Sequence, residues 1–291
     1  MKLDEFPGIK TDVSLKGYST FGVGGAAKYF YELNDVAELS GLIEAAHEDK
    51  VPFFILGGGS NVLFMDEGFS GLIVRMVASE VRVEDDVVVA DGGAKWGAIL
   101  KAVHEAGLGG IEEFSGLPGT IGGSVVGNAG CFGKEIKDVF VSAKIYDCET
   151  NEVRKVGPDY FNFKYRWSRA KETKVAILQV KLRLSGQASN QQSGQALDSK
   201  EARFDRQPPG LSGGSFFKNP SPEQPAGKLI DECGLKGLQI GGAQISEKHA
   251  NFFMNVGGAT SVDLLALCDR AKDEVRERFG IELEEEVVIV R

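Results

Sequence analysis

The sequence predicts a protein of mixed α-helices and β-strands, divided into a larger first unit and a smaller second one. Segments 34–50, 95–107 and 261–280 place apolar residues at helical spacing. Short apolar or alternating runs between them are typical of strands. A chain of 291 residues is also long enough to build more than one hydrophobic core.

Each element follows from a local pattern. The first helix can be capped by Asn34 or Asp35, and its apolar positions are Val36, Leu39, Ile43 and Ala46. Strands are expected at 51–56 and 71–76, followed by a hairpin over 81–93 that turns at Asp85 and Asp86. A helix over 95–107, a half-buried strand over 175–184, a helix over 261–280 and a strand over 281–291 complete the pattern.

The domain boundaries follow from one change in composition. Residues 185–200 are rich in Ser, Gln and Gly and nearly free of large apolar groups, so they cannot offset their ordering entropy by burial. We therefore predict a first unit over 1–184, with lobes of about 1–65 and 66–184, and a linker over 185–202. A second unit over 203–280 and a C-terminal strand over 281–291 that returns to the core complete the division.

Charge and cysteine usage exclude several classes of protein. A net charge of −9 argues against a nucleic-acid partner, because phosphate backbones need basic surface. The four cysteines are far apart and form no C-x-x-C, so neither a metal centre nor a disulfide framework is expected. No apolar run is long enough for a membrane span or a signal peptide, which predicts a cytoplasmic protein that does not contact membranes.

Two glycine-rich segments are the strongest chemical signal. Residues 56–63, LGGGSNVL, follow a strand, and residues 116–130 read GLPGTIGGSVVGNAG. Consecutive glycines let backbone N–H groups approach a phosphate without a Cβ in the way. Two such segments could hold a pyrophosphate from both sides, although each taken alone is also explained as a tight turn between strands.

Two common nucleotide motifs are excluded. The stretch GVGGAA at 22–27 fits G-x-G-x-x-A, but a strand-like KYFYEL follows it instead of a helix. No G-x-x-x-x-G-K-[ST] occurs anywhere in the chain.

A further set of motifs resembles one enzyme family. STFGVGG, LGGGSNVL, GLPGTIGGSVVGNAG, FKYRWS, GGSFFKNP, AGKLIDECGLKGLQIGGAQIS, HANFFMN and LEEEV occur in the order found in UDP-N-acetylenolpyruvoylglucosamine reductases, the flavoenzymes called MurB. The resemblance runs from about Tyr18 to the last residues and omits the linker. It implies an FAD-binding unit of the p-cresol methylhydroxylase/vanillyl-alcohol oxidase type and a smaller α+β substrate domain.

The resemblance also implies a reaction and its catalytic residues. NADPH reduces non-covalently bound FAD, a hydride from the flavin adds to C3 of an enolpyruvyl ether, and C2 must then receive a proton to complete UDP-N-acetylmuramate, a peptidoglycan precursor. Ser215 matches the proton donor of the family. Arg166 and Glu286 match the groups that stabilise the charge on the substrate carboxylate, with the pKa of Glu286 expected to be raised by burial.

Further residues are assigned to the two ligands by the same resemblance and by the glycine-rich pattern. The expected FAD contacts are Gly57, Gly58, Gly59, Ser60, Asn61, Val62, Ser115, Gly116, Pro118, Gly119, Thr120, Gly122, Gly123, Asn128, Ala129 and Gly130. The expected contacts to the UDP-sugar are Tyr165, Arg206, Lys218, Asn219, Lys228, His249 and Asn251, although a capping or core role is an equal alternative for the last two.

The chain departs from the family at one segment. Many relatives have Met-Asn-Ala-Gly-Ala-Tyr-Gly where this chain has GNAGCFG, so Gly127, Cys131 and Phe132 differ and a tyrosine hydroxyl is lost. The segment before GGSFF is also too short for the tyrosine-bearing insertion of one subclass. We expect a monomer of the subclass without that insertion.

Two alternative functions remain open from the residues. The glycine-rich segments alone would also suit another FAD-dependent oxidoreductase of this fold that acts on a hydroxy acid or sugar. A non-catalytic flavin or nucleotide-sugar binding module is the third reading. Ser215, Arg166 and Glu286 together favour the reductase.

Overall fold

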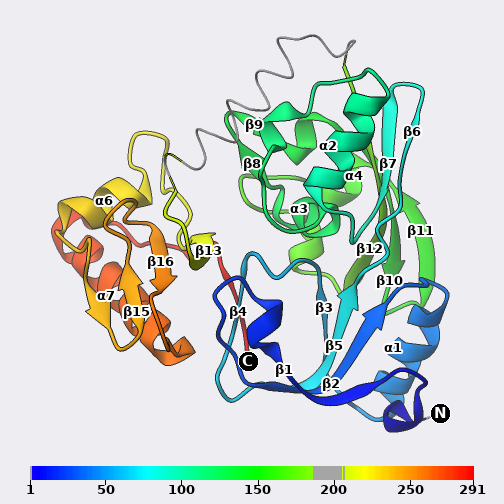
Figure 1. Ribbon diagram of the computed structural model, residues 1–291, viewed down its shortest axis with the longest axis horizontal. Helices are drawn as coiled ribbons and strands as arrows, with labels where there is room; N and C mark the ends of the chain where they lie inside the picture. The colour runs from blue at the N-terminus through cyan, green and yellow to red at the C-terminus, as the bar shows by residue number, and fades with distance from the viewer. Residues whose placement is uncertain (1, 186–204, 206) are drawn as a thin grey trace. The chain divides into compact units, whose positions relative to one another are not determined.

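A computed structural model of the chain describes residues 2–185, 205 and 207–291. These residues form two compact units, and the chain passes between them several times (Figure 1). Unit 1 contains residues 1–10, 29–58 and 71–202, and unit 2 contains residues 11–28, 59–70 and 203–291. The predicted linker over 185–202 lies almost entirely outside the described residues.

Unit 1 is built on an antiparallel sheet whose strand order is β11-β10-β12-β7-β6. The strands are β6 (Val81–Glu84), β7 (Val87–Asp91), β10 (Phe140–Asp147), β11 (Glu152–Val156) and β12 (Val175–Arg183). Helices α2 (Trp96–Glu105), α3 (Ile121–Gly127) and α4 (Pro158–Phe161) pack on one face of this sheet (Figure 1). Trp96, Ile99, Val125 and Phe161 from these helices share a core with Ala143 and other sheet residues.

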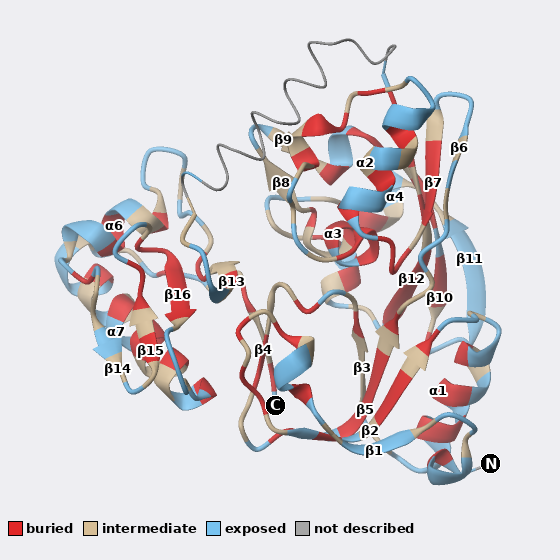
Figure 2. Ribbon diagram, viewed as in Figure 1, coloured by how far each residue is buried: buried red, intermediate tan, exposed pale blue. Residues whose placement is uncertain are grey.

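A second core of unit 1 lies on the other face of β12. It joins α1 (Glu38–Glu48) to β3 (Phe53–Leu56) and β5 (Phe69–Met76), which pair in parallel. Figure 2 shows most of β12 as buried, because Ile177 points into the first core while Ala176 and Leu178 point into the second. The predicted alternation holds only in the second half of β12, where Lys181 and Arg183 are less buried than their neighbours.

Three strands carry the chain across the boundary between the units. They are β1 (Lys10–Ser14), β2 (Ala26–Leu33) and β5, which belong with β3 to a sheet of order β1-β2-β5-β3. The short hairpin of β8 (Gly130–Cys131) and β9 (Lys134–Glu135) belongs to unit 1.

Unit 2 has an antiparallel sheet of order β13-β16-β15-β14 with two helices on one face. Its elements are β13 (Leu211–Ser215), α6 (Ala226–Glu232), β14 (Gln239–Ile240), β15 (Ala243–Ile245), β16 (Phe252–Asn255) and α7 (Ser261–Phe279). The C-terminal strand β17 (Val288–Val290) pairs in parallel with β4 (Val62–Phe64). Phe21, Val23 and Leu63 are fully buried in the core that Phe216, Phe253 and α7 also form.

Most predicted elements are confirmed. The hairpin turns at Asp85, whose φ is +52°, and the segment after GVGGAA is the strand β2. The first helix begins later than its predicted cap, because Asp35 accepts a hydrogen bond from the N–H of Ala37 before the helix starts at Glu38. Segments 11–28 and 59–70 group with unit 2, whereas the sequence placed them in the first unit.

The second glycine-rich segment contains a helix that the sequence analysis treated as a loop. Thr120 caps α3 by accepting a hydrogen bond from the N–H of Gly123, and the buried Trp96 indole donates to Ser124 Oγ at 3.0 Å. These tertiary contacts outweigh the low helix propensity of its glycines. No helix among the described residues combines the length and the apolar character that crossing a membrane requires.

Candidate active site

The two glycine-rich segments meet inside unit 1. A Cβ added to Gly57 would lie 2.6 Å from Thr120 Oγ1, and one added to Gly58 would lie 2.6 Å from the Cα of Gly119. The glycines therefore allow two backbones to pack closely, as the tight-turn reading required. Gly122 serves the same purpose farther along, because its Cβ would lie 2.8 Å from the carbonyl oxygen of Gly92.

The same loops retain features that suit a phosphate-bearing cofactor. Gly58, Gly116 and Gly123 are exposed at the surface of unit 1. Within the described part of the chain, the backbone N–H groups of Gly57, Gly58, Gly116 and Gly119 donate no hydrogen bond. Unused N–H groups without a neighbouring Cβ are the donors that a pyrophosphate needs, so these loops fit the FAD that the sequence predicts.

Residues 59–62 of the first loop belong to unit 2, where they hold other backbone segments. A Cβ at Gly59, whose φ is +67°, would lie 1.9 Å from the carbonyl oxygen of Tyr18. Ser60 and Val62 accept hydrogen bonds through their carbonyl oxygens, from Thr20 and Ser19. Asn61 donates through Nδ2 to the carbonyl oxygen of Glu286 at 2.9 Å, a link that the sequence analysis missed.

Asn128 uses its side chain within unit 1. Its Nδ2 donates to Glu135 Oε2 at 3.0 Å and to the carbonyl oxygen of Lys164 at 2.9 Å, while its Oδ1 accepts from the N–H of Lys137 at 3.1 Å. The residue is fully buried, with a left-handed φ of +42° that ends α3. The neighbouring Ala129 closes the helix end by donating to the carbonyl oxygen of Ser124.

Arg166 sits in a tight turn of unit 1. Lys164 and Trp167 exchange backbone hydrogen bonds of 2.9 and 3.1 Å, so Tyr165 and Arg166 are the two central residues. The φ of Arg166 is +53°, and its guanidinium lies 5.3 Å from the centre of the Tyr165 ring. Tyr165 itself is 45% exposed and can therefore reach a ligand.

Ser215 ends a bulged strand of unit 2. The pairing of β13 with β16 shifts between Ser212 and Ser215, and the two glycines between them form the bulge. A Cβ at Gly213 would lie 2.4 Å from the Phe21 ring, whereas Gly214 has a φ of +80° and open space around it. Among the described residues, the Ser215 hydroxyl makes no hydrogen bond.

Glu286 lies beside this serine in unit 2. The N–H of Glu286 donates to the carbonyl oxygen of Phe216 at 2.8 Å, so Ser215 and Glu286 lie on adjacent backbone segments. The three glutamates of LEEEV separate here. Glu284 pairs with Lys218, and Glu285 contacts Lys272 at 2.5 Å, which leaves Glu286 on the segment next to the serine.

The predicted UDP-sugar residues of unit 2 differ in their surroundings. The Lys218 side chain is 17% exposed and pairs with Glu284, and Asn219 Oδ1 accepts from the N–H of Ala226 at the start of α6. The Lys228 side chain is 64% exposed on α6, and its Nζ lies 3.8 Å from Glu232 Oε1. Arg206 lies outside the described residues.

Asn251 and His249 act as structural groups in unit 2. The Asn251 amide accepts from the N–H of Phe217 at 2.9 Å and donates to its carbonyl oxygen at 2.8 Å, and the residue is 2% exposed. His249 Nδ1 accepts from the N–H of Asn251, which places the proton of the neutral ring on Nε2. Burial lowers the pKa of His249 below its usual value, so the ring is neutral near pH 7.

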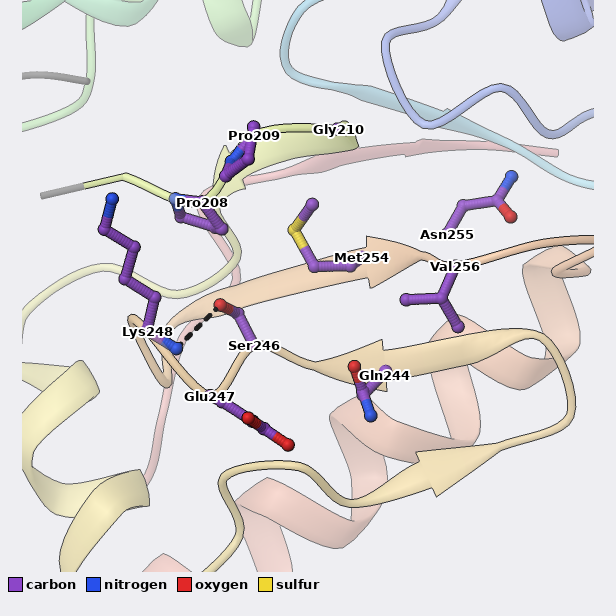
Figure 3. Close-up of a pocket in the computed structure, with 10 residues that line it drawn as sticks. All are labelled: Pro208, Pro209, Gly210, Gln244, Ser246, Glu247, Lys248, Met254, Asn255 and Val256. Atoms are coloured by element: carbon purple, nitrogen blue, oxygen red, sulfur yellow. Dashed lines mark hydrogen bonds between the residues drawn. The ribbon is translucent and has the colours of Figure 1, made fainter. Parts of the chain in front are cut away.

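A cavity of about 410 Å³ opens on the sheet of unit 2 (Figure 3). Gln244 and Met254 face it from paired positions of β15 and β16, on the opposite face from the buried Ala243 and Phe253. None of the predicted site residues lines this cavity. Clusters of His, Cys, Asp and Glu that would hold a metal are also absent from the described residues.

Comparison with known proteins identifies the family. Residues 27–157 match the FAD binding domain model, and residues 207–290 match the C-terminal domain model of UDP-N-acetylenolpyruvoylglucosamine reductase. The chain is 38% identical over 283 residues to that reductase from Caldicellulosiruptor bescii, covering 96% of this chain and 90% of the relative. The chain belongs to the MurB family.

Other members support the same conclusion. The MurB relative from Rubrobacter xylanophilus is 36% identical over 288 residues, covering 98% of this chain and 96% of its own. The crystal structure of MurB from Thermus caldophilus superposes with a TM-score of 0.83 at 32% identity, covering 97% of this chain and 99% of that one. The FAD-binding fold expected from the sequence is thereby confirmed.

Proposed function

We propose that this protein reduces UDP-N-acetylglucosamine enolpyruvate to UDP-N-acetylmuramate with FAD as cofactor and NADPH as reductant. Family membership over nearly the whole chain supports this reaction. The residue assignment rests mainly on the position of Ser215. This residue ends the bulged strand β13, next to the backbone segment that contains Glu286.

Ser215 is proposed as the proton donor to C2 of the substrate. The bound FAD supplies the hydride that saturates the enolpyruvyl double bond. A donor must present its O–H to carbon without competing hydrogen bonds, and within the described residues the Ser215 hydroxyl has none. A Cβ added at Gly214, the residue before the serine, would meet nothing within 4 Å.

Arg166 and Glu286 are proposed to stabilise the charge that develops on the substrate carboxylate. The planar guanidinium of Arg166 can donate two parallel hydrogen bonds to a carboxylate. Glu286 is held through its backbone, because its N–H donates to the carbonyl oxygen of Phe216 and its carbonyl oxygen accepts from Asn61.

We propose that the glycine-rich loops bind FAD and that residues of unit 2 bind the UDP-sugar. The backbone N–H groups of Gly57, Gly58, Gly116 and Gly119 would hold the FAD pyrophosphate. Lys218 would supply positive charge to the UDP diphosphate, and the neutral His249 would offer its Nε2 proton. Asn251 would contribute to the site indirectly, by accepting the backbone N–H of Phe217, the second residue after Ser215.

A two-step titration tests this function. Purified protein should be yellow, lose its visible flavin absorbance with NADPH under anaerobic conditions, and regain it when the enolpyruvyl sugar is added. The product should be two mass units heavier than the substrate. Bleaching without recovery on addition of the sugar would contradict the proposal and favour another flavin-dependent oxidoreductase.

We also propose that the enzyme acts as a monomer in the cytoplasm. Among the described residues, several exposed large apolar side chains, such as Phe132, Val153 and Val262, come from separate elements, which favours a monomer. Sedimentation velocity should give a single species near the chain mass of 31.3 kDa. A dimer at micromolar concentration would contradict this expectation.

A further inference from the structure

The turn that carries Arg166 is attached to the end of α3 on both sides. Before the turn, the carbonyl oxygen of Lys164 accepts from Asn128 Nδ2 at 2.9 Å. After it, Ser168 Oγ donates to the carbonyl oxygen of Val126 at 2.8 Å. Asn128 and Ser168 are both fully buried, so these hydrogen bonds are shielded from water.

The backbone at Arg166 is held in a conformation that arginine disfavours. A left-handed φ of +53° is unfavourable for a residue with a side chain, and glycine or asparagine would avoid most of that cost. The surrounding structure must therefore impose this conformation. The backbone hydrogen bonds between Lys164 and Trp167 close the turn, and the two hydrogen bonds to α3 anchor it on either side.

Gly130 provides the space for the arginine head group. A Cβ at this position would lie 3.1 Å from Arg166 Nη1, 3.0 Å from the carbonyl oxygen of Lys134 and 2.8 Å from Glu135 Cγ. The φ of Gly130 is not left-handed, so glycine is needed here for close approach and not for backbone freedom. Glu135 in turn accepts from Asn128 Nδ2 at 3.0 Å, which joins the hairpin of β8 and β9 to the same cluster.

We infer that Asn128 and Gly130 are positioning residues for Arg166, and that they orient its guanidinium toward the carboxylate of the enolpyruvyl substrate. This inference rests on the proposed function. It differs from the cofactor role that the sequence suggested, because both N–H donors of the Asn128 amide are already bonded within unit 1. α3 begins at Thr120 beside the predicted FAD loop, so one short helix connects that loop to the arginine.

Gly130→Ala tests the inference directly, and Gly127→Ala is its matched control. Gly127 lies three residues earlier, and a Cβ there meets nothing within 4 Å. Stopped-flow absorbance measures flavin reduction by NADPH and re-oxidation separately, and flavin reduction should stay within about twofold of wild type in Gly127→Ala. Re-oxidation by the enolpyruvyl sugar should slow about 10- to 100-fold in Gly130→Ala, because small misplacement of a binding group has effects of this size, and should be unchanged in Gly127→Ala.

Asn128→Gly is the second variant, since glycine keeps the left-handed φ and removes only the amide. It should raise the substrate concentration needed for half-maximal re-oxidation by about 10-fold while FAD content and near-UV circular dichroism stay as in wild type. A double-mutant cycle with Arg166→Lys completes the test. Gly130→Ala should have no further effect in that background, because the guanidinium it displaces is gone.

Three results would overturn the inference. They are additive effects in the cycle, slower flavin reduction or FAD loss in Asn128→Gly, and wild-type re-oxidation in both variants. Failure of the proposed function is distinguishable, because wild-type flavin would then not be re-oxidised by the enolpyruvyl sugar at all.

Discussion

Ser215 owes its position to the two glycines before it. Gly213 packs under the Phe21 ring, and Gly214 takes the left-handed φ that the bulge requires. The hydroxyl is therefore placed by backbone geometry and not by hydrogen bonds of its own, which is the arrangement expected of a group that must give a proton to carbon.

Ser215→Ala should separate the two half-reactions. Flavin reduction by NADPH should stay near the wild-type rate, and re-oxidation by the enolpyruvyl sugar should slow about 10²- to 10⁴-fold because the proton donor is missing. Single-turnover absorbance measures both steps. Ser212→Ala in the same strand is the control and should leave both rates within a few fold of wild type, whereas equal slowing of both steps in Ser215→Ala would contradict the role.

Glu285 gives a prediction about pH. Burial is the largest single influence and would raise the pKa of this carboxyl group, but the hydrogen bond from Lys272, the Lys272 charge and the other hydrogen bonds to the carboxylate together hold the pKa below its usual 4.5. A lowered pKa in the folded state stabilises the protein above pH 4.5 and loses that effect as the pH falls through the lowered value. Glu285→Gln should therefore reduce the free energy of unfolding at pH 7 by on the order of 1 kcal/mol.

Urea denaturation at several pH values measures this difference. The gap between wild type and Glu285→Gln should narrow steadily below pH 4.5. Glu284→Gln is the comparison, because its side chain is 72% exposed and an exposed ion pair contributes little. A gap that stays constant down to pH 3 would argue against the pairing with Lys272.

At the scale of elements, α7 is the helix best specified by local sequence. Thr260 accepts from the N–H of Asp263 at 3.0 Å, and Asp263 Oδ2 accepts from the N–H of Thr260 at 3.0 Å, which completes a capping box. Gly280 ends the helix with a φ of +69°. These signals explain why the sequence predicted the start at Ser261 and the end at Gly280 correctly.

Thr260→Ala should lower the free energy of unfolding by about 1 kcal/mol, because the N–H of Asp263 loses the Thr260 hydroxyl that accepts its hydrogen bond. Chemical denaturation monitored by circular dichroism is the measurement. Val262→Ala, two residues into the helix at a 57% exposed position, should be neutral or slightly stabilising. Equal losses in the two variants would show that the cap has no special role.

α3 shows where prediction from local sequence fails. Its residues IGGSVVG have poor helix propensity, and its stability comes from Trp96 and from close packing on Gly92, which are distant in the sequence. Glycines at 57–58 and 116–130 were predicted to approach a ligand, which stays a prediction, and several of them also allow close packing between backbones. Sequence pattern shows that a Cβ must be absent, but it does not show which atom occupies the space.

At the scale of the molecule, the sequence predicted two units, and the structure shows two, but the sequence did not predict which segments join unit 2. Phe21, Val23 and Leu63 lie more than 140 residues before Phe216 in the sequence, yet all are fully buried in one core. Nothing in the local pattern of these three residues indicates their partners. The catalytic assignments of Ser215, Arg166 and Glu286 came from the family motifs and stay predictions.

A fragment of residues 203–291 should therefore not fold as the sequence alone suggested. It would lack Phe21, which packs edge-on against Phe216 at 6.1 Å, and β17 would lose its partner β4. Buried apolar residues of this size each contribute about 1.5–3 kcal/mol, a large share of the stability of a small domain. We expect no cooperative thermal transition in the fragment, in contrast to the full chain, and a sharp transition would contradict this expectation.

The pairing of β17 with β4 can form only late during synthesis of the chain. β4 leaves the ribosome early, but its partner is the last of the described elements to be made. The backbone of Val62–Phe64 can therefore pair with β17 only after most of the chain has been translated. Until β17 is made, the backbone of β4 lacks the strand that it pairs with. The nascent chain would therefore keep this strand accessible to chaperones until synthesis is nearly complete.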